Sequence, residues 1–315
     1  VEPFFLKKFS DANREQLTSF LGSVWGNLTT AIEKSRNISS DELDRYLNEG
    51  LAMGQASNAV DYKLADGLRY RYEVENCVKE MAGQDVKGKL KTAGVDKIVS
   101  IKVKEKENKN KIAVLYAEGE IRDEDSSSPF SADEQVISEE MANKLRKLKD
   151  DDDVKAVVFR VNSPGGSAYI SEQIWKEVVE LKAKKPIVVS MGNYAASGGY
   201  YISCAANKIV AERTTLTGSI GVFGVVRNFT GTFDKVGVTT DIVKTNTFAD
   251  LGDISRPMRE DEKALIQRGV EQTYDLFLTR CADGRGMTKA EIDSIGQGRV
   301  WTGEQALERG LVDQL

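Results

Sequence analysis

The chain has 315 residues, which is long enough for a buried core and for more than one domain. A composition of 40% hydrophobic and 30% charged residues is ordinary for a globular protein, and the net charge of −5 argues against nucleic acid as a general partner. Histidine is absent, which excludes a Ser-His-Asp triad, a Cys-His pair and most zinc sites. Acid–base chemistry in this chain must therefore use Lys, Asp, Glu, Tyr or a terminal amine.

Neither a membrane span nor a secretory leader is visible in the sequence. No run approaches the roughly 18–20 apolar residues that cross a bilayer, and no charged-apolar-small pattern opens the chain. Because the chain starts at Val1 without a methionine, we expect it to be a fragment or a processed product. Three cysteines, Cys77, Cys204 and Cys281, have no C-x-x-C spacing, so we expect buried thiols and neither a disulfide framework nor a metal site.

The first part of the chain, residues 1–68, is predicted to be mainly helical. Apolar side chains recur in it at helical spacing, at Leu17, Leu21, Trp25, Leu28 and Ile32. The run S-S-D-E that begins at Ser39 is typical of a helix start. Residues 69–111 are rich in charge and end in the polar run K-E-K-E-N-K-N-K, which predicts a connector.

From residue 112 to residue 315, apolar strand-like segments alternate with helical patterns. Strands are predicted at residues 112–116, 154–161, 187–191, 209–211 and 240–243. The polar residues 122–134 are predicted to form a loop, and the acidic run 150–153 a solvated turn. The alternation predicts an α/β fold with a largely parallel sheet.

A weak internal repeat links the two ends of the chain. The run I-S-S-D-E-L-D that ends at Asp44 resembles M-T-K-A-E-I-D that ends at Asp293, at an offset of 249 (293 minus 44). Residues 59–68 resemble residues 306–315 at an offset of 247 (306 minus 59). Two matches in the same order at nearly one offset favour a tandem duplication whose first copy is present only in its last part. Chance similarity of helical segments is the alternative.

Glycine-rich turns follow two of the predicted strands. The first turn, residues 162–167 (N-S-P-G-G-S), leaves backbone N–H groups directed at one point, which suits an anion or a developing oxyanion. The second, residues 191–200 (M-G-N-Y-A-A-S-G-G-Y), places Ser197 among small residues at the start of a helix. The alternatives are an ordinary tight turn for the first and a serine N-cap for the second. A third run of glycine and polar residues, 217–222 (T-G-S-I-G-V), is by itself typical of a turn between strands.

Together, these segments resemble the signal peptide peptidase A (protease IV) family. Four motifs carry the resemblance in order: R-V-N-S-P-G-G-S (160–167), A-A-S-G-G-Y (195–200), T-L-T-G-S-I-G-V (215–222) and G-R-V-W-T-G…A…G-L-V-D (298–313). The opening V-E-P-F also resembles the late first half of the long, duplicated form of that family. The resemblance implies the crotonase-like α/β superhelical fold shared with the Clp proteolytic subunit. It also implies that residues 1–68 are the helical remnant of a first repeat, and it is weakest over residues 69–111.

The resemblance implies a set of site residues. Ser197 matches the nucleophilic serine, Gly166 matches a glycine whose N–H forms part of the oxyanion hole, and Gly198 is a second candidate donor. Ser219 matches a serine that hydrogen-bonds a catalytic lysine. The mechanism would be a Ser/Lys dyad without metal or cofactor, in which a neutral lysine takes the serine proton. We expect Ser197 and the Gly166 N–H to face one cavity.

The lysine is the point at which this chain departs from the family pattern. In the short family form the lysine follows the T-G-S run, and that position falls near Ala249 and Asp250, where no lysine stands. In the long form it lies a few residues before V-E-P-F, so we expect the general base to lie upstream of Val1. Three lysines remain as other candidates, although none matches the family position: Lys7, Lys8 and Lys244.

Three functions are compatible with these residues. We expect a membrane-associated serine endopeptidase that degrades cleaved signal peptides on the extracytoplasmic side of the bacterial inner membrane. Its partners would be hydrophobic peptides and further copies of the chain, with the membrane reached through a segment absent from this chain. The alternatives are a crotonase-type acyl-thioester enzyme without a nucleophilic serine and a non-catalytic scaffold derived from the protease. Without its lysine, the isolated chain is expected to be inactive.

Overall fold

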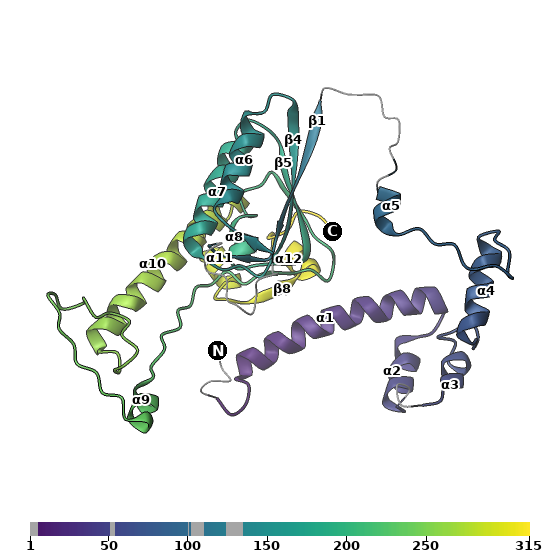
Figure 1. Cartoon of the computed structure of the whole chain (residues 1–315), viewed down its shortest axis with the longest axis horizontal. Helices are drawn as coiled ribbons and strands as arrows, with labels where there is room; N and C mark the ends of the chain where they lie inside the picture. Colours follow the sequence, from purple (N-terminus) through teal and green to yellow (C-terminus); the bar gives the residue numbers. More distant parts are fainter. Residues whose placement is uncertain (1–5, 51–53, 100, 102–109, 124–134) are drawn as a thin grey trace. The chain divides into compact units, whose positions relative to one another are not determined.

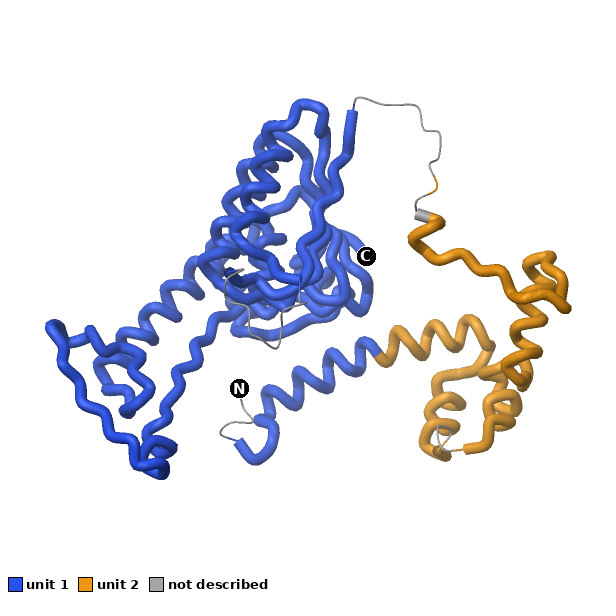
Figure 2. Tube along the Cα trace, in the orientation of Figure 1, with its two compact units in different colours: residues 1–24, 110–315 blue, residues 25–109 orange. Residues whose placement is uncertain are grey.

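The computed structural model describes residues 6–50, 54–99, 101, 110–123 and 135–315 (Figure 1). The chain forms two compact units, one of residues Val1–Val24 and Asn110–Leu315 and the other of residues Trp25–Lys109 (Figure 2). This grouping differs from the sequence-based division at residue 68, because the first turns of the N-terminal helix belong with the C-terminal part of the chain. The boundary at which the chain returns to the first unit, at residue 110, lies next to the predicted start of the second repeat at residue 112.

The smaller unit consists of helices. Its elements are the end of α1 (Asp11–Arg36), then α2 (Ser40–Asn48), α3 (Ala56–Asp61), α4 (Arg71–Met81) and α5 (Val95–Val99). The helix start predicted at Ser39 is confirmed by a capping box with Glu42. The Glu42 carboxylate accepts the Ser39 backbone N–H at 3.1 Å, while the Ser39 hydroxyl accepts the N–H of Glu42. The predicted connector contains α4 and α5, while most of its polar run, residues 104–111, lies outside the described residues.

Three helices near the start of the chain match three at its end in spacing. α1 and α10 (Glu260–Arg285) both have 26 residues, and their starts lie 249 positions apart (260 minus 11). α3 and α12 (Gly303–Glu308) both have 6 residues, and their starts lie 247 positions apart (303 minus 56). α2 and α11 (Lys289–Ile295) both follow a capping box. These offsets equal those of the sequence repeat, which supports its interpretation as a duplication.

A 6-stranded sheet forms the centre of the larger unit. Its order is β1-β4-β5-β7-β8, with β6 paired to β5. The strands are β1 (Lys111–Glu118), β4 (Val154–Ser163), β5 (Ile187–Ala196), β6 (Lys208–Val210), β7 (Leu216–Gly218) and β8 (Val300–Thr302). Neighbouring strands are parallel, except that β8 runs antiparallel to β7. A separate parallel pair is formed by β2 (Glu120–Ile121) and β3 (Val136–Ile137).

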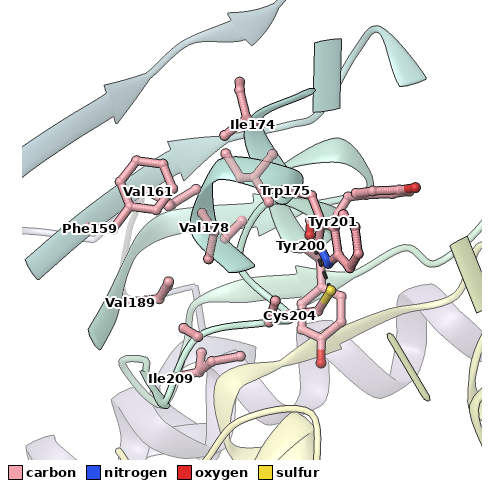
Figure 3. Packing of buried hydrophobic residues seen from close by; sticks show 14 of the residues in the cluster. Phe159, Val161, Ile174, Trp175, Val178, Val189, Tyr200, Tyr201, Cys204 and Ile209 are labelled. Atoms are coloured by element: carbon pink, nitrogen blue, oxygen red, sulfur yellow. Dashed lines mark hydrogen bonds between the residues drawn. The ribbon is translucent and has the colours of Figure 1, made fainter. Parts of the chain in front are cut away.

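Two helices, α6 (Glu140–Asp150) and α7 (Ala168–Lys182), lie along one face of this sheet (Figure 1). Between them and the sheet lies an apolar core that includes Phe159 of β4 and Ile174 of α7, both fully buried (Figure 3). Tyr200 of α8 (Gly198–Tyr201) is also fully buried, and its hydroxyl donates to the Leu311 carbonyl oxygen at 2.9 Å. The core therefore anchors the short helix that follows Ser197.

Two expectations about local structure are wrong. Residues 240–243 form no strand: they lie between α9 (Thr230–Val236) and α10, and Val243 is 100% exposed. Val, Ile and Thr favour strands where a neighbouring strand can pair with them, and none does so here among the described residues. Cys77 is exposed, whereas Cys204 and Cys281 are buried as expected. Most of the predicted loop at residues 122–134 lies outside the described residues.

A cluster of charged side chains fixes the segment between α9 and α10. Arg256 lies 2.6 Å from carboxylate oxygens of both Asp250 and Glu262. Lys244 Nζ lies 3.0 Å from Asp250 Oδ1. The Glu262 side chain is 1% exposed. Hydrogen bonding from Arg256 is the main reason that the pKa of Glu262 is lowered to about 2.

We predict that Glu262→Gln destabilises the larger unit at pH 7, because the half-buried Arg256 would lose one of its two carboxylate partners. The folded-state pKa of Glu262, about 2, is below its ordinary value of 4.5, so its contribution is present above pH 4.5 and is lost as the pH falls towards 2. The difference in urea midpoint from wild type should therefore shrink over that range. Glu260→Gln is the control, since its side chain is on the same helix and 88% exposed. Equal effects of the two substitutions would contradict this account.

Candidate active site

Ser197 occupies the junction between β5 and α8. Its backbone has φ 52° and ψ −119°, a region that costs a residue with a side chain about 1–3 kcal/mol. The Ser197 N–H donates to the Gly218 carbonyl oxygen of β7 at 2.9 Å, which holds this conformation. The Ser197 side chain makes no capping hydrogen bond to α8. Because α8 has only 4 residues, its dipole contributes little to stabilising negative charge at Ser197.

The first glycine turn approaches this junction so closely that side chains do not fit. Gly165 has φ 103°, and a Cβ on it would lie 2.6 Å from the Gly198 nitrogen. Gly166 has φ 145°, and a Cβ on it would lie 2.1 Å from the Ile121 carbonyl oxygen of β2. Both the space and the backbone angles therefore require glycine.

β2 fixes the direction of the Gly166 amide. The Ile121 N–H donates to the Gly165 carbonyl oxygen at 2.8 Å, and the Ser167 N–H donates to the Ile121 carbonyl oxygen at 2.7 Å. In a parallel pairing, the residue between two such bonds turns its own N–H away from the neighbouring strand. The N–H of Gly166 therefore points away from β2.

A third segment, at the end of β7, completes the site. The buried Thr217 hydroxyl donates to the Ala195 carbonyl oxygen at 2.7 Å and so fastens β7 to β5. Ser219 follows with φ 48°, and its N–H donates to the Arg299 carbonyl oxygen at 2.7 Å. The Ser219 hydroxyl lies 3.5 Å from the Gly298 carbonyl oxygen, which is a weak hydrogen bond.

Two pockets meet at Ser197. The larger, of about 770 Å³, lies among β2, the first glycine turn, Ser219 and α10. The smaller, of about 170 Å³, includes Gly198 and the aromatic side chains of α8 and α10. Ser197 and Gly166 line both pockets, as expected from the two glycine turns. The structure therefore brings together the four site residues that the sequence indicated: Ser197, Gly166, Gly198 and Ser219.

The lysine candidates lie elsewhere. Lys7 and Lys8 are exposed, and Lys244 is bound to Asp250 in the charged cluster. Asp250, which lies in the region where the family resemblance led us to look for a lysine, belongs to the same cluster. Among the described residues, no lysine lines either pocket at Ser197. Within the same ranges, no group of Cys, Asp and Glu side chains is arranged to hold a metal ion.

One wall of the larger pocket comes from α10, which the glycine motifs did not identify. Gln267, Glu271 and Tyr274 recur at positions i, i+4 and i+7 and line the pocket. The Tyr274 hydroxyl donates to Asp293 Oδ1 at 2.6 Å, and burial is the main cause that raises the pKa of Tyr274 to about 12. Helical spacing could have grouped these residues, but it could not show that their face of the helix meets Ser197.

We predict that Gly166→Ala disrupts the site, because the added Cβ would meet the Ile121 carbonyl oxygen 2.1 Å away. The amides of Ile121 and Ser167 should exchange with solvent faster than in wild type, and the free energy of unfolding should fall by more than about 1 kcal/mol. Gly269→Ala is the matched control, since apart from the neighbouring backbone of α10 no atom lies within 4 Å of its added Cβ. Wild-type exchange rates in Gly166→Ala would show that the close approach does not fix this turn.

Comparison with known proteins covers the whole chain. Residues 179–315 match the model of Peptidase family S49, and residues 127–220 match that of Clp protease. Protease 4 of Haemophilus influenzae is 36% identical over 325 residues, covering 100% of this chain and 52% of that protein. Protease 4 of Salmonella typhi is 37% identical over 322 residues, which cover 100% of this chain and 51% of that protein. Serine protease SPPA, chloroplastic, of Arabidopsis thaliana is 32% identical over 313 residues, which cover 98% of this chain and 46% of that protein.

The chain spans about half the length of these relatives. A solved ClpP1 mutant from Listeria monocytogenes covers 64% of this chain and 89% of its own at 15% identity and a TM-score of 0.42, a likeness too weak to argue from. The Clp protease match agrees with the parallel strands and alternating helices, and the fold is therefore Clp-protease-like α/β. Through the S49 match and the similarity to Protease 4 and SPPA along its length, the chain belongs to the signal peptide peptidase A family.

Proposed function

We propose that Ser197 is the nucleophile of a serine endopeptidase and that the N–H groups of Gly166 and Gly198 form its oxyanion hole. The observation that supports this most is the strained backbone at Ser197. The Ser197 side chain makes no capping hydrogen bond to α8, and Ser197 lines both pockets beside the glycine turn. Strain of this kind is concentrated at functional sites. Gly198 opens α8, so its N–H has no carbonyl partner within the helix.

In the proposed reaction, the Ser197 oxygen attacks the carbonyl carbon of a peptide while a neutral lysine amine takes the hydroxyl proton. The carbonyl oxygen becomes an oxyanion that accepts hydrogen bonds from Gly166 and Gly198. The lysine ammonium then protonates the leaving amine as the C–N bond breaks, which leaves an acyl group on Ser197. Water, deprotonated by the same lysine, releases the acid and restores the serine.

We propose that the lysine comes from a segment that precedes Val1 and that the Ser219 hydroxyl is its hydrogen-bond partner. Two observations support this. No described lysine lines the pockets at Ser197, and Ser219 lines the larger one with its hydroxyl in a weak bond. A lysine that enters this pocket would lose part of its hydration, which lowers its pKa from about 10.4 towards the range of a base.

The proposed substrates are hydrophobic peptides such as cleaved signal peptides. The smaller pocket supports this, because Val222, Phe223, Tyr201 and Phe277 line it and suit an apolar side chain. We also propose that the protein is a homo-oligomer on the extracytoplasmic side of the bacterial inner membrane, attached through a segment outside this chain. In the described ranges, no helix has the length and apolar character that crossing a bilayer requires.

We predict that the present chain hydrolyses a peptide ester no faster than its Ser197→Ala variant, because the serine hydroxyl stays protonated at neutral pH without a base. A longer form that restores the preceding residues with their lysine should hydrolyse the ester and should react with a serine-directed phosphonate. Ser197→Ala in that form should abolish both, with a loss in kcat of at least about 1000-fold. Ser219→Ala should lower kcat while the phosphonate still labels Ser197.

The other outcomes point to different functions. If the present chain already hydrolyses the ester and Ser197→Ala does not, a base lies within residues 1–315, and Lys7, Lys8 and Lys244 are the first to substitute. A longer form that is neither active nor labelled would be a non-catalytic scaffold. Turnover of an acyl-coenzyme A thioester that survives Ser197→Ala would identify a crotonase-type enzyme.

A further inference from the structure

The first turns of α1 contact β8, the strand at the end of the sheet order. A strand in this place presents backbone N–H groups that no neighbouring strand satisfies. The Gln16 side-chain oxygen Oε1 accepts a hydrogen bond from the Val300 N–H at 3.3 Å. A side chain of α1 therefore takes the place of a neighbouring strand at this backbone group.

Two serines extend the same contact along α1. The Ser19 hydroxyl accepts a hydrogen bond from Gln305 Nε2 at 3.0 Å, and the Ser23 hydroxyl lies 2.9 Å from Thr302 Oγ1. Together with Gln16, these residues are spaced i, i+3 and i+7, so they lie on one face of the helix. This face is polar, and its contacts with β8 and with Gln305 of α12 set the position of α1.

Residues 297–300, called the 297–300 loop below, lead into β8, whose first residue is Val300, and connect this contact to the site. The Arg299 carbonyl oxygen accepts the Ser219 N–H at 2.7 Å, and the Gly298 N–H donates to the carbonyl of the residue after Ser219 at 2.9 Å. A Cβ on Gly221 would lie 2.7 Å from Gly298 Cα, so the two backbones touch without intervening side chains. A shift of the 297–300 loop must therefore move Ser219.

The 297–300 loop is also a wall between two pockets. Gln297 and Gly298 line the larger pocket at Ser197. The same two residues, with the first turns of α1, also line a third pocket, of about 690 Å³, between the 297–300 loop and α1. Since this third pocket leaves the 297–300 loop without close packing against α1, the loop is held to α1 by polar contacts. The Gln16 contact reaches the backbone of the loop directly.

We infer that Gln16 is a positioning residue for the reaction proposed at Ser197. Its side-chain oxygen holds Val300 and the 297–300 loop, and the loop holds Ser219 and one wall of the pocket. Ser19 and Ser23 place Gln16 at the correct point along β8. The catalytic part of this inference rests on the proposed function, whereas the link from α1 to Ser219 does not.

The test replaces Gln16 with side chains of similar length. Gln16→Met removes the hydrogen-bond acceptor, and Gln16→Glu keeps an oxygen in its place. Thr18→Ala is the control, because Thr18 is exposed and lies two residues away on the opposite face of α1. Amide exchange of Val300 and Ser219 is measured in the present chain, and kcat and KM are measured in the longer, active form.

We expect Gln16→Met to speed exchange at both amides and to lower kcat/KM by roughly threefold to tenfold, the scale of one hydrogen bond. Gln16→Glu should restore most of both properties, and Thr18→Ala should change neither. Unchanged exchange in Gln16→Met, or an equal loss in Gln16→Glu or Thr18→Ala, overturns the inference. If the longer form is inactive, the proposed function fails, and the exchange rates in the present chain still decide whether α1 holds Ser219.

Discussion

The close approach of two backbone turns is the constraint on which the larger unit depends. The turn at Gly165 and Gly166 touches both β2 and the junction at Ser197, and a Cβ at either glycine would lie within 2.6 Å of backbone atoms. Beside this contact, Ser197 is held in a conformation that costs about 1–3 kcal/mol. Fully buried side chains beside it, such as Ile121 and Tyr200, each contribute roughly 1.5–3 kcal/mol. The surrounding core is therefore sufficient to maintain the strain.

The site occupies one edge of the sheet for a topological reason. β1, β4, β5 and β7 are neighbours and run parallel, so their carboxyl ends lie at the same edge. The segments that follow these ends carry Ile121, Gly166, Ser197 and Ser219 in the same order. In open α/β sheets, ligands bind at this edge. The regular core thus ends where the strands end, and the irregular segments beyond it carry the residues of the candidate site.

This edge could be predicted from the sequence, because each glycine turn directly follows an apolar strand. The turns that carry Gly166 and Ser197 were located in that way, whereas the roles of these two residues came from the family resemblance. The starts of β1, β4 and β5 were predicted to within one residue. The rest depends on contacts between distant residues. The face of α10 that carries Tyr274 meets the pocket through tertiary packing, and residues 240–243 have strand-forming side chains but no strand to pair with. The grouping of residues 1–24 with the sheet likewise depends on contacts such as that of Gln16, which no local pattern reveals.

The contact between Gln16 and Val300 joins residues that are 284 positions apart, and this separation bears on how the chain is made. α1 leaves the ribosome before β8, so at roughly 5–20 residues per second the helix waits on the order of tens of seconds for its binding strand. Throughout this time, Leu21 and Leu28 have little to pack against, since they are 55% and 50% exposed even in the folded protein. The contact between α1 and β8 therefore closes a separation of 284 positions, and until β8 is made the apolar side chains of α1 are open to association with other chains.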